Sequence, residues 1–206
     1  MAEPDLKILR QAVEVASARL DEAARRLAPK QVGGEIEAYE AAFQDLMFAE
    51  RNLAEAEGRP YAVLQDCPLQ WDVGAPLPTL LQSDNQTFLF FLLARNDEGA
   101  GVLEFDRCLS TTFGSPGDET FEGHLLHGSG FEPYRAMRVV NSPWIEQLAQ
   151  IDSVHPRHDP DSYAEAHHFI FPFHDSTFEC VARSFTASKV DDPLPQVVKG
   201  MIDEMF

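Results

Sequence analysis

The sequence predicts an α+β protein in which an N-terminal antiparallel helical hairpin precedes a mainly antiparallel β-sheet domain with two short helices. Three observations predict this fold class: heptad-like apolar spacing before residue 58, strand-length apolar runs after residue 61, and two helix starts that contain proline. We therefore expect two domains. Residues 1–58 form a coiled-coil-like hairpin, and residues 61–206 form an α+β domain.

The first helix is expected over residues 5–28, where apolar residues are spaced alternately three and four apart. This seam consists of Leu6, Leu9, Val13, Ala16, Leu20, Ala23 and Leu27. Pro29 ends the helix, and residues 31–34 form a turn into a second helix that Gly58 and Pro60 end. The second seam consists of Ile36, Tyr39, Phe43, Leu46 and Leu53. The short link predicts that the two helices are antiparallel.

A two-helix hairpin buries little apolar surface by itself, so other residues must cover it. Four further apolar residues lie off the two seams and widen the apolar face: Ile8, Val15, Met47 and Phe48. Two alternatives follow. The hairpin either forms a homodimer or docks on a protein partner, or it packs onto its own C-terminal domain.

Strand patterns begin after Tyr61. Residues 87–95 form a continuous apolar run, residues 102–106 alternate, and residues 96–101 between them read as a hairpin loop. Further strands are expected over residues 134–140, 168–173 and 177–185. Strands linked by such short segments predict a mainly antiparallel sheet.

Two short helices complete the expected domain. Ser142-Pro143 supplies a capping hydroxyl and a proline at the first helical position, and Asp192-Pro193 does the same for the last helix. Their apolar stripes are Trp144, Ile145, Leu148 and Ile151 in the first helix, and Val198, Met201, Ile202 and Met205 in the last.

Composition limits the classes of partner. The 206 residues include 34 acidic and 16 basic side chains, for a net charge of −18. Such a surface repels phosphate backbones and anionic membrane surfaces, so neither nucleic acid nor membrane is an expected partner. Residues 1–60 hold 12 acidic and 8 basic side chains, so most of the excess charge lies in the second domain.

The three cysteines, Cys67, Cys108 and Cys180, are odd in number and form no Cys-x-x-Cys pair, which favours reduced thiols. Cys180 lies in an apolar strand and is expected as a small buried side chain. The N-terminus lacks the pattern of a signal peptide, and the longest apolar run, residues 88–94, is too short to cross a bilayer. We therefore expect a cytoplasmic protein.

All seven histidines fall between His124 and His174. Histidine titrates near neutral pH and is a common metal ligand, so this window is where site chemistry is expected. The candidate metal ligands are His124, His155, His158, His168 and His174, and a divalent transition metal such as zinc is the cofactor that these donors would hold.

The segment from His168 to Glu179 reads as a strand, a tight turn and a second strand. Alternation places His168 and His174 on one face and the phenylalanines between them on the other, so the aromatic rings are expected in the core. His168, His174 and Asp175 are the candidate binding residues. Asp175 and Glu179 are the candidate catalytic residues, either as a carboxylate that orients a histidine or as a general base.

Several motifs in this region resemble those of a family of uncharacterised bacterial proteins. They are Gly114-x-Pro116-x-Asp118-Glu119, Gly123-His124, Val140-Asn141-Ser142-x-Trp144-Ile145, Val154-His155-Pro156-x-His158 and His168-Phe169-x-Phe171-x-Phe173-His174-Asp175-Ser176-Thr177-Phe178-Glu179. The resemblance covers roughly residues 71–185 and implies a bacterial source, without an established activity. The sequence departs from the family's pattern at Gly117, where an asparagine is expected.

Two functions are consistent with these features. The first is a cytoplasmic binding or interaction protein that has a histidine-lined pocket or face, with room for a small molecule, and a hairpin for self-association or docking. The alternative is a metal-dependent enzyme, of a hydrolytic kind, that uses the clustered histidines.

Overall fold

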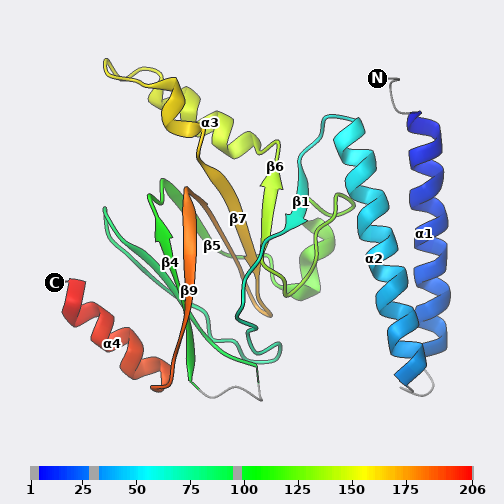
Figure 1. The fold of residues 1–206 in the computed structure, drawn as a ribbon, viewed down its shortest axis with the longest axis horizontal. Helices are drawn as coiled ribbons and strands as arrows, with labels where there is room; N and C mark the ends of the chain where they lie inside the picture. Colours follow the sequence, from blue (N-terminus) through cyan, green and yellow to red (C-terminus); the bar gives the residue numbers. More distant parts are fainter. Residues whose placement is uncertain (1–4, 28–32, 95–98, 206) are drawn as a thin grey trace. The chain divides into compact units, whose positions relative to one another are not determined.

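The computed structural model describes residues 5–27, 33–94 and 99–205 (Figure 1). The chain divides into two compact units, of which the first contains Met1–Val63 and Leu125–Glu132 and the second contains Leu64–His124 and Pro133–Phe206. The chain therefore passes between the units three times. The expected helix end at Pro29, the start of the turn at residues 31–32 and most of the loop at residues 96–98 lie outside the described residues.

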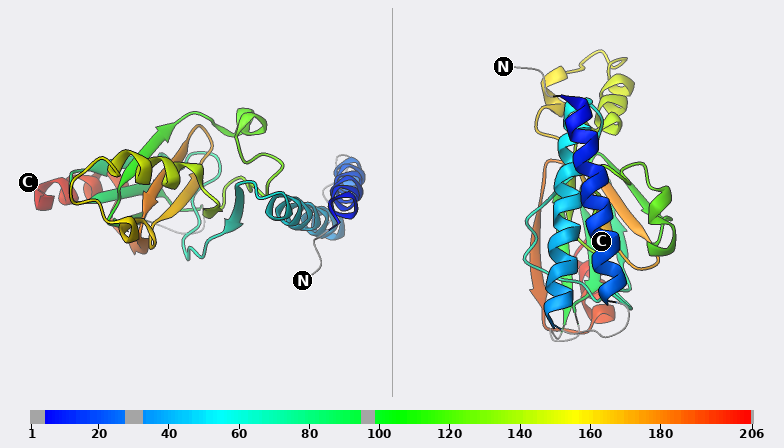
Figure 2. Two further views of the ribbon diagram at one scale, coloured as in Figure 1. Left: turned by 90° about the horizontal axis from the view of Figure 1, so that it is seen from above. Right: turned by 90° about the vertical axis from the view of Figure 1, so that its right-hand side faces the viewer.

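In the first unit, helices α1 (Leu6–Leu27) and α2 (Gly33–Ala56) lie side by side along their length (Figure 2). Ion pairs show their direction, because Arg10 near the start of α1 contacts Glu57 just beyond α2 at 2.8 Å. Arg19 of α1 contacts Asp45 of α2 at 3.7 Å, closer to the other end of the pair. The expected antiparallel helical hairpin is confirmed. Strand β1 (Tyr61–Leu64) follows α2.

The heptad seam is the least exposed side of α1, but only its two alanines, Ala16 and Ala23, are fully buried. Its leucines are half-buried, because each of them packs against a single partner helix. Of the four off-seam residues, Met47 is buried, whereas Ile8, Val15 and Phe48 are exposed. The hairpin thus keeps an incompletely covered apolar face.

A polar network fixes the segment Leu125–Glu132 to α2 within the first unit. The Arg51 guanidinium donates to the carbonyl oxygens of Ala62 and Gly130 and forms an ion pair with Glu132, which is 1% exposed. Gly130 has a φ of +80°, and a Cβ at this position would lie 2.4 Å from Cγ of Arg51. Only glycine satisfies both constraints. The network explains why a segment distant in sequence belongs to the helical unit.

The second unit contains two antiparallel sheets rather than the single sheet that the sequence predicted. Within this unit, one sheet has the order β6-β7-β8-β5 and the other the order β2-β3-β4-β9. Their strands are β2 (Thr79–Gln82), β3 (Thr87–Leu92), β4 (Ala100–Asp106), β5 (Ser110–Gly114), β6 (Met137–Val140), β7 (His167–Pro172), β8 (Thr177–Ala182) and β9 (Ser184–Val190).

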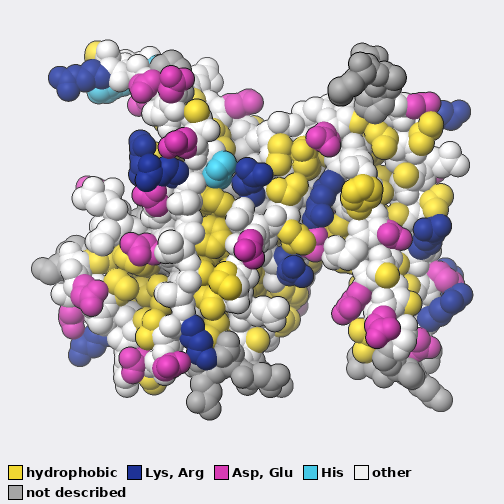
Figure 3. Space-filling view, viewed as in Figure 1, with side chains coloured by type: hydrophobic (Ala, Val, Ile, Leu, Met, Phe, Trp, Pro, Cys, Tyr) yellow, Lys and Arg dark blue, Asp and Glu magenta, His cyan; other side chains and the backbone are white. Residues whose placement is uncertain are grey.

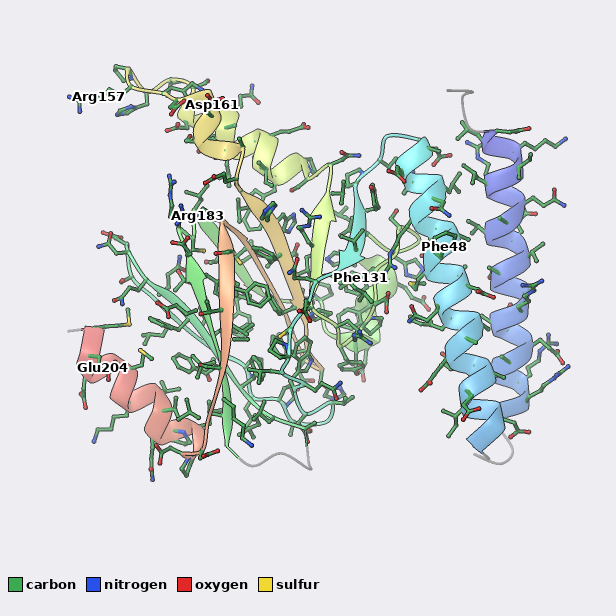
Figure 4. The ribbon with its side chains drawn as sticks, viewed as in Figure 1. Phe48, Phe131, Arg157, Asp161, Arg183 and Glu204 are labelled. Atoms are coloured by element: carbon green, nitrogen blue, oxygen red, sulfur yellow. The ribbon has the colours of Figure 1, made fainter. Side chains whose placement is uncertain are left out.

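The strand expected over residues 177–185 is two strands that belong to different sheets. The chain changes sheet at Arg183, whose N–H donates to the Asp106 carbonyl and whose guanidinium pairs with the Asp106 carboxylate (Figure 4). Periodicity could not reveal this break, because the apolar pattern continues on both sides of it.

The core lies between the two sheets. One sheet contributes Leu89, Phe91, Leu103 and Phe105, and the other contributes Phe169, Phe171, Phe173, Phe178 and Cys180. The ring of Phe171 packs edge-on against Phe105 at 5.7 Å between centroids and lies 6.1 Å from Phe178. The expected burial of the phenylalanines in β7 is confirmed.

Short helices flank the sheets. Helix α3 (Pro143–Asp152) begins as expected, with Ser142 as its N-cap and proline in the first turn. Helix α4 (Leu194–Met205) packs Val198 and Met201 against Phe88 and Phe90, although Ile202 of the expected stripe is 41% exposed. Two 3-10 helices, η1 (Asp118–Gly123) and η2 (Pro160–Tyr163), lie in the connections.

Among the described residues, no helix has the length and apolar character needed to cross a membrane.

Replacing Phe171 by alanine is expected to lower the free energy of unfolding by about 3–5 kcal/mol, because it leaves a cavity at a fully buried site. Phe113→Ala is the matched control, since Phe113 also packs on Phe178 but is 42% exposed. Urea denaturation of both variants measures the difference. Equal losses of stability in the two variants would contradict the assignment of Phe171 to the core.

Candidate functional site

Strand pairing determines which side chains of β7 and β8 share a face. Ile170 lies opposite Glu179 and His168 lies opposite Val181, so His168 and Glu179 are diagonal neighbours on the face away from the aromatic core. This face was expected to be open, with His168 pointing outward or into a pocket. It is instead covered, and His168 is 7% exposed and Ile170 is 0% exposed.

The Glu179 carboxylate lies between two histidines that are far apart in sequence. Its Oε2 is 2.8 Å from Nε2 of His168, and its Oε1 is 3.6 Å from Nε2 of His124. The side chains of His124 and His168 are 7% and 9% exposed. Of the residues expected at a site, these three are therefore brought together.

The other ring nitrogen of His168 contacts Ser142. Its Nδ1 lies 2.9 Å from the Ser142 hydroxyl oxygen, which also accepts the Ile145 N–H as the N-cap of α3. The Trp144 ring packs edge-on against the imidazole at 5.0 Å. Hydrogen bonds thus join Ser142 to His168 and His168 to Glu179. This is the order of hydroxyl, imidazole and carboxylate that enzymes use to activate a serine nucleophile.

This arrangement does not present a nucleophile to a substrate. Ser142 is 6% exposed, and its hydroxyl already caps a helix. A catalytic serine needs an accessible oxygen beside a space for the reacting carbonyl. The four side chains Ser142, His168, Glu179 and His124 form a polar network that joins α3 and η1 to the sheet.

Electrostatics within the network favour an ionised carboxylate. Burial by itself would raise the pKa of Glu179, but the interactions with His124 and His168 outweigh it and hold the pKa at about 2. The carboxylate is consequently charged at neutral pH.

A second histidine–carboxylate pair lies at the turn between β7 and β8. His174 Nδ1 is 2.7 Å from Oδ2 of Asp118, and the Tyr134 hydroxyl donates to the same oxygen. The hydrogen bond from Tyr134 is the largest influence on Asp118; desolvation opposes it and His174 adds to it, and the pKa of Asp118 is lowered. Burial, followed by the bond to Asp118, raises the pKa of Tyr134 to about 12.

The backbone also ties this turn to η1. The Asp118 N–H donates to the His174 carbonyl at 2.7 Å. A Cβ on Gly117 would lie 2.9 Å from that same carbonyl oxygen, so the close approach requires glycine at this position rather than the asparagine that was expected. The His174 side chain is 40% exposed, and Asp175 beside it is 94% exposed.

The remaining candidate ligands lie in the loop after α3. His158 Nδ1 is 3.0 Å from the Asp152 carboxylate, and His155 Nδ1 accepts the Arg157 N–H at 3.1 Å. The five candidate metal ligands are thus distributed over three places. Within residues 5–27, 33–94 and 99–205, no group of three or more His, Cys, Asp or Glu side chains has an arrangement that could hold a metal ion.

The described residues form two sizeable hollows that each lie within a single unit, and no histidine lines either of them. The first, of about 740 Å³, is a groove between α1 and α2. The second, of about 360 Å³, is a partly open pocket beside Trp71, Tyr134 and Arg135. The indole N–H of Trp71 has no hydrogen-bond partner among the described residues, but its accessible area is below 1 Å², so a molecule in the pocket does not reach it.

Sequence reasoning missed three residues of these networks, namely Ser142 as a partner of His168, and Asp118 and Tyr134 as partners of His174. Ser142 was identified only as a helix cap. Asp118 stands among the family-like motifs, but no spacing links it to a histidine 56 residues away. Long-range pairing of this kind follows from the strand register and carries no local signal.

No protein-family model, curated protein sequence or solved structure matches the chain. The function of its surfaces therefore has to be inferred from their own geometry.

Replacing Glu179 by glutamine is expected to remove a negative charge that stabilises the folded protein. The contribution of this charge to the free energy of unfolding depends on pH. The folded pKa of about 2 lies below the ordinary value of 4.5, so the stabilisation is complete above pH 4.5 and is lost as pH falls through about 2. At pH 7 the loss should be about 3 kcal/mol, since one pKa unit corresponds to about 1.4 kcal/mol. Urea unfolding between pH 7 and about pH 3 measures it.

The exposed carboxylate Glu122 gives the matched control, and Glu122→Gln should change stability little at any pH. His124 and His168, which face the carboxylate, remain in both variants. If Glu179→Gln lowered the free energy of unfolding by the same amount from pH 7 down to pH 3, the side chain would act through packing and not through its charge.

Proposed function

We propose that the protein is a binding protein that pairs with a second copy of itself through its helical hairpin. The observation that carries this proposal is the open groove of about 740 Å³ between α1 and α2. A hairpin that leaves its seam half-covered is stabilised when a second hairpin lies over it, because the four helices then enclose one apolar core.

The lining of the groove suits another helix. Small residues allow close approach of helix backbones, and five of them line the groove together with Val15. They are Ala18, Ala23, Gly34, Ala38 and Ala42. Val15 is 45% exposed, and Ile8 and Ile36 on the same two helices are 63% and 39% exposed. Contact with a second hairpin would remove this apolar surface from water, which favours association.

Charges at the groove are balanced. Arg19 and Arg26 line it together with Glu22 and Glu35, so two basic and two acidic side chains face any occupant. Figure 3 shows apolar, acidic and basic side chains interspersed over the helical unit. In a dimer with two-fold symmetry, the same surface of each copy forms the interface. A surface that carries both acidic and basic side chains can then place the acidic groups of one copy opposite the basic groups of the other.

The distribution of charge along the chain favours the hairpin over other surfaces for self-association. Residues 1–60 have 12 acidic and 8 basic side chains, whereas the remaining 146 residues have 22 and 8. Two copies that met through the strongly acidic part would repel each other. Electrostatic repulsion between two copies of the protein is therefore smallest when they meet through their helical hairpins.

The alternative function, metal-assisted hydrolysis, draws no support from the arrangement of the histidines. His124 and His168 are held by Glu179, His174 is held by Asp118, and His158 lies beside Asp152.

Ala18→Glu tests the proposed interface in the full-length protein. Ala18 is exposed and lines the groove, so glutamate leaves the single chain folded but places a charge inside the interface of the pair. Light scattering from about 1 μM to about 1 mM should show wild type at twice the mass of one chain. The variant should need about 100-fold higher concentration to dimerise, because burying an uncompensated charge costs about 3 kcal/mol.

Ala24→Glu supplies the control, because Ala24 is an exposed alanine of the same helix that does not line the groove. Its mass should equal that of wild type. A wild-type protein that stays monomeric over the whole concentration range would show self-association to be wrong. Equal dimerisation of the two variants would show that the pair forms through another surface.

A further inference from the structure

The partly open pocket of about 360 Å³ lies in the second unit, outside the helical hairpin. Two segments line it, one from residues 64–73 and the other from residues 134–136. The Gln65 N–H donates to the Ala136 carbonyl at 2.9 Å and joins the two segments. Small-molecule sites have volumes of about 300–1,000 Å³, and this pocket is near the lower end of that range. It therefore has room for one small molecule.

The walls of the pocket are held in place by further contacts. The Ala94 N–H donates to the Gln70 carbonyl at 2.9 Å, which fixes the first segment beside the end of β3. In the second segment, Tyr134 has a φ of +59°, and its hydroxyl donates to Asp118. A residue with a bulky side chain adopts this backbone conformation at a cost in free energy, so the surrounding contacts must hold Tyr134 there. The pocket is thus formed before a ligand binds.

One acidic and one basic side chain line the pocket, and both are available to a ligand. They are Asp66 and Arg135, which are both exposed. Each is the sequence neighbour of one member of the hydrogen-bonded pair Gln65 and Ala136, and neighbouring Cα atoms are about 3.8 Å apart, so the two backbones lie close together. Within the part of the chain that the structure describes, neither side chain has a hydrogen bond or an ion pair.

Apart from two glutamines, the rest of the lining is apolar or aromatic. Trp71 is 4% exposed and lines the pocket with its ring, because its indole N–H is out of reach. Leu64 and Val73 also line the pocket and are 38% and 53% exposed. A ligand that covered these side chains would remove apolar surface from water, which favours binding.

We propose that this pocket binds a free α-amino acid with an apolar side chain. The ligand's carboxylate pairs with the Arg135 guanidinium, which can form two parallel hydrogen bonds to it. The ligand's ammonium group pairs with the Asp66 carboxylate. Its apolar side chain lies against Trp71 and Val73. The site is independent of the proposed self-association, since no residue of the hairpin lines it.

Other classes of small molecule match this lining less well. A nucleotide or a sugar phosphate would bring two or more negative charges to a single arginine, in a chain whose net charge is −18. A fatty acid would place its apolar chain beside Asp66, and a simple amine would leave Arg135 without a carboxylate. A molecule with one charge of each sign and an apolar part matches both charged side chains and the apolar wall.

The first measurement is a calorimetric titration of the full-length protein with L-leucine and with L-phenylalanine. At least one of them should bind with a Kd at or below about 1 mM. Two analogues test the charges in the wild-type protein. N-acetyl-L-leucine lacks the ammonium group and L-leucinamide lacks the carboxylate, so each should bind at least about tenfold more weakly than L-leucine, because each loses one charged hydrogen-bonded contact.

Two variants then locate the contacts. Arg135→Gln should weaken the binding of L-leucine at least about tenfold and leave that of L-leucinamide unchanged, because L-leucinamide has no carboxylate to pair with the arginine. Asp66→Asn should weaken the binding of L-leucine and leave that of N-acetyl-L-leucine unchanged. Arg157→Gln is the matched control, since Arg157 is an exposed arginine that does not line the pocket (Figure 4). It should bind L-leucine as the wild type does.

Three results would overturn the proposal. The first is a wild-type protein that binds neither amino acid at about 10 mM, by calorimetry and by saturation-transfer NMR. The second is equal affinity of the wild type for L-leucine and L-leucinamide. The third is an equal loss of affinity for these two molecules in Arg135→Gln, which would show that the arginine shapes the pocket without binding a carboxylate. Light scattering reports self-association separately, so the two proposals can fail independently.

Discussion

The register between β7 and β8 is the constraint on which the second unit depends. One pairing, with Phe171 opposite Phe178 and Ile170 opposite Glu179, places aromatic rings on one face and the polar pair His168 and Glu179 on the other. A shift by a single residue would move the Glu179 carboxylate into the aromatic core. The core and the histidine network are therefore two results of the same set of backbone hydrogen bonds.

Carboxylates are the most frequent partners of the histidines in this structure. Two of the histidine–carboxylate pairs connect segments that are far apart in sequence: His174 with Asp118, and His124 with Glu179. An ionised carboxylate with two imidazole neighbours avoids the cost of an unpaired buried charge. His168 has both ring nitrogens in such contacts, with Ser142 at 2.9 Å and with Glu179 at 2.8 Å.

Local patterns in the sequence predicted the elements well and their long-range relations poorly. The heptad seam identified the less exposed side of α1, and Ser142-Pro143 marked the start of α3, because caps and periodicity act within a few residues. The change of sheet at Arg183 was missed, since it depends on a contact with Asp106. His168 was expected on an open face, and its burial depends on α3, whose Trp144 covers the imidazole.

The buried pair of Arg51 and Glu132 has a further consequence for the way the polypeptide can be divided. Glu132 is separated in sequence from the helices by the whole segment Leu64–His124, yet it completes their unit. A fragment that ended at residue 63 would leave Arg51 without its carboxylate, and the remaining fragment would expose Glu132 without its cation. Neither piece is complete by itself. Residue 63 also lies inside β1 (Tyr61–Leu64), so a break there divides a strand as well as the buried ion pair and is a poor boundary for an isolated domain.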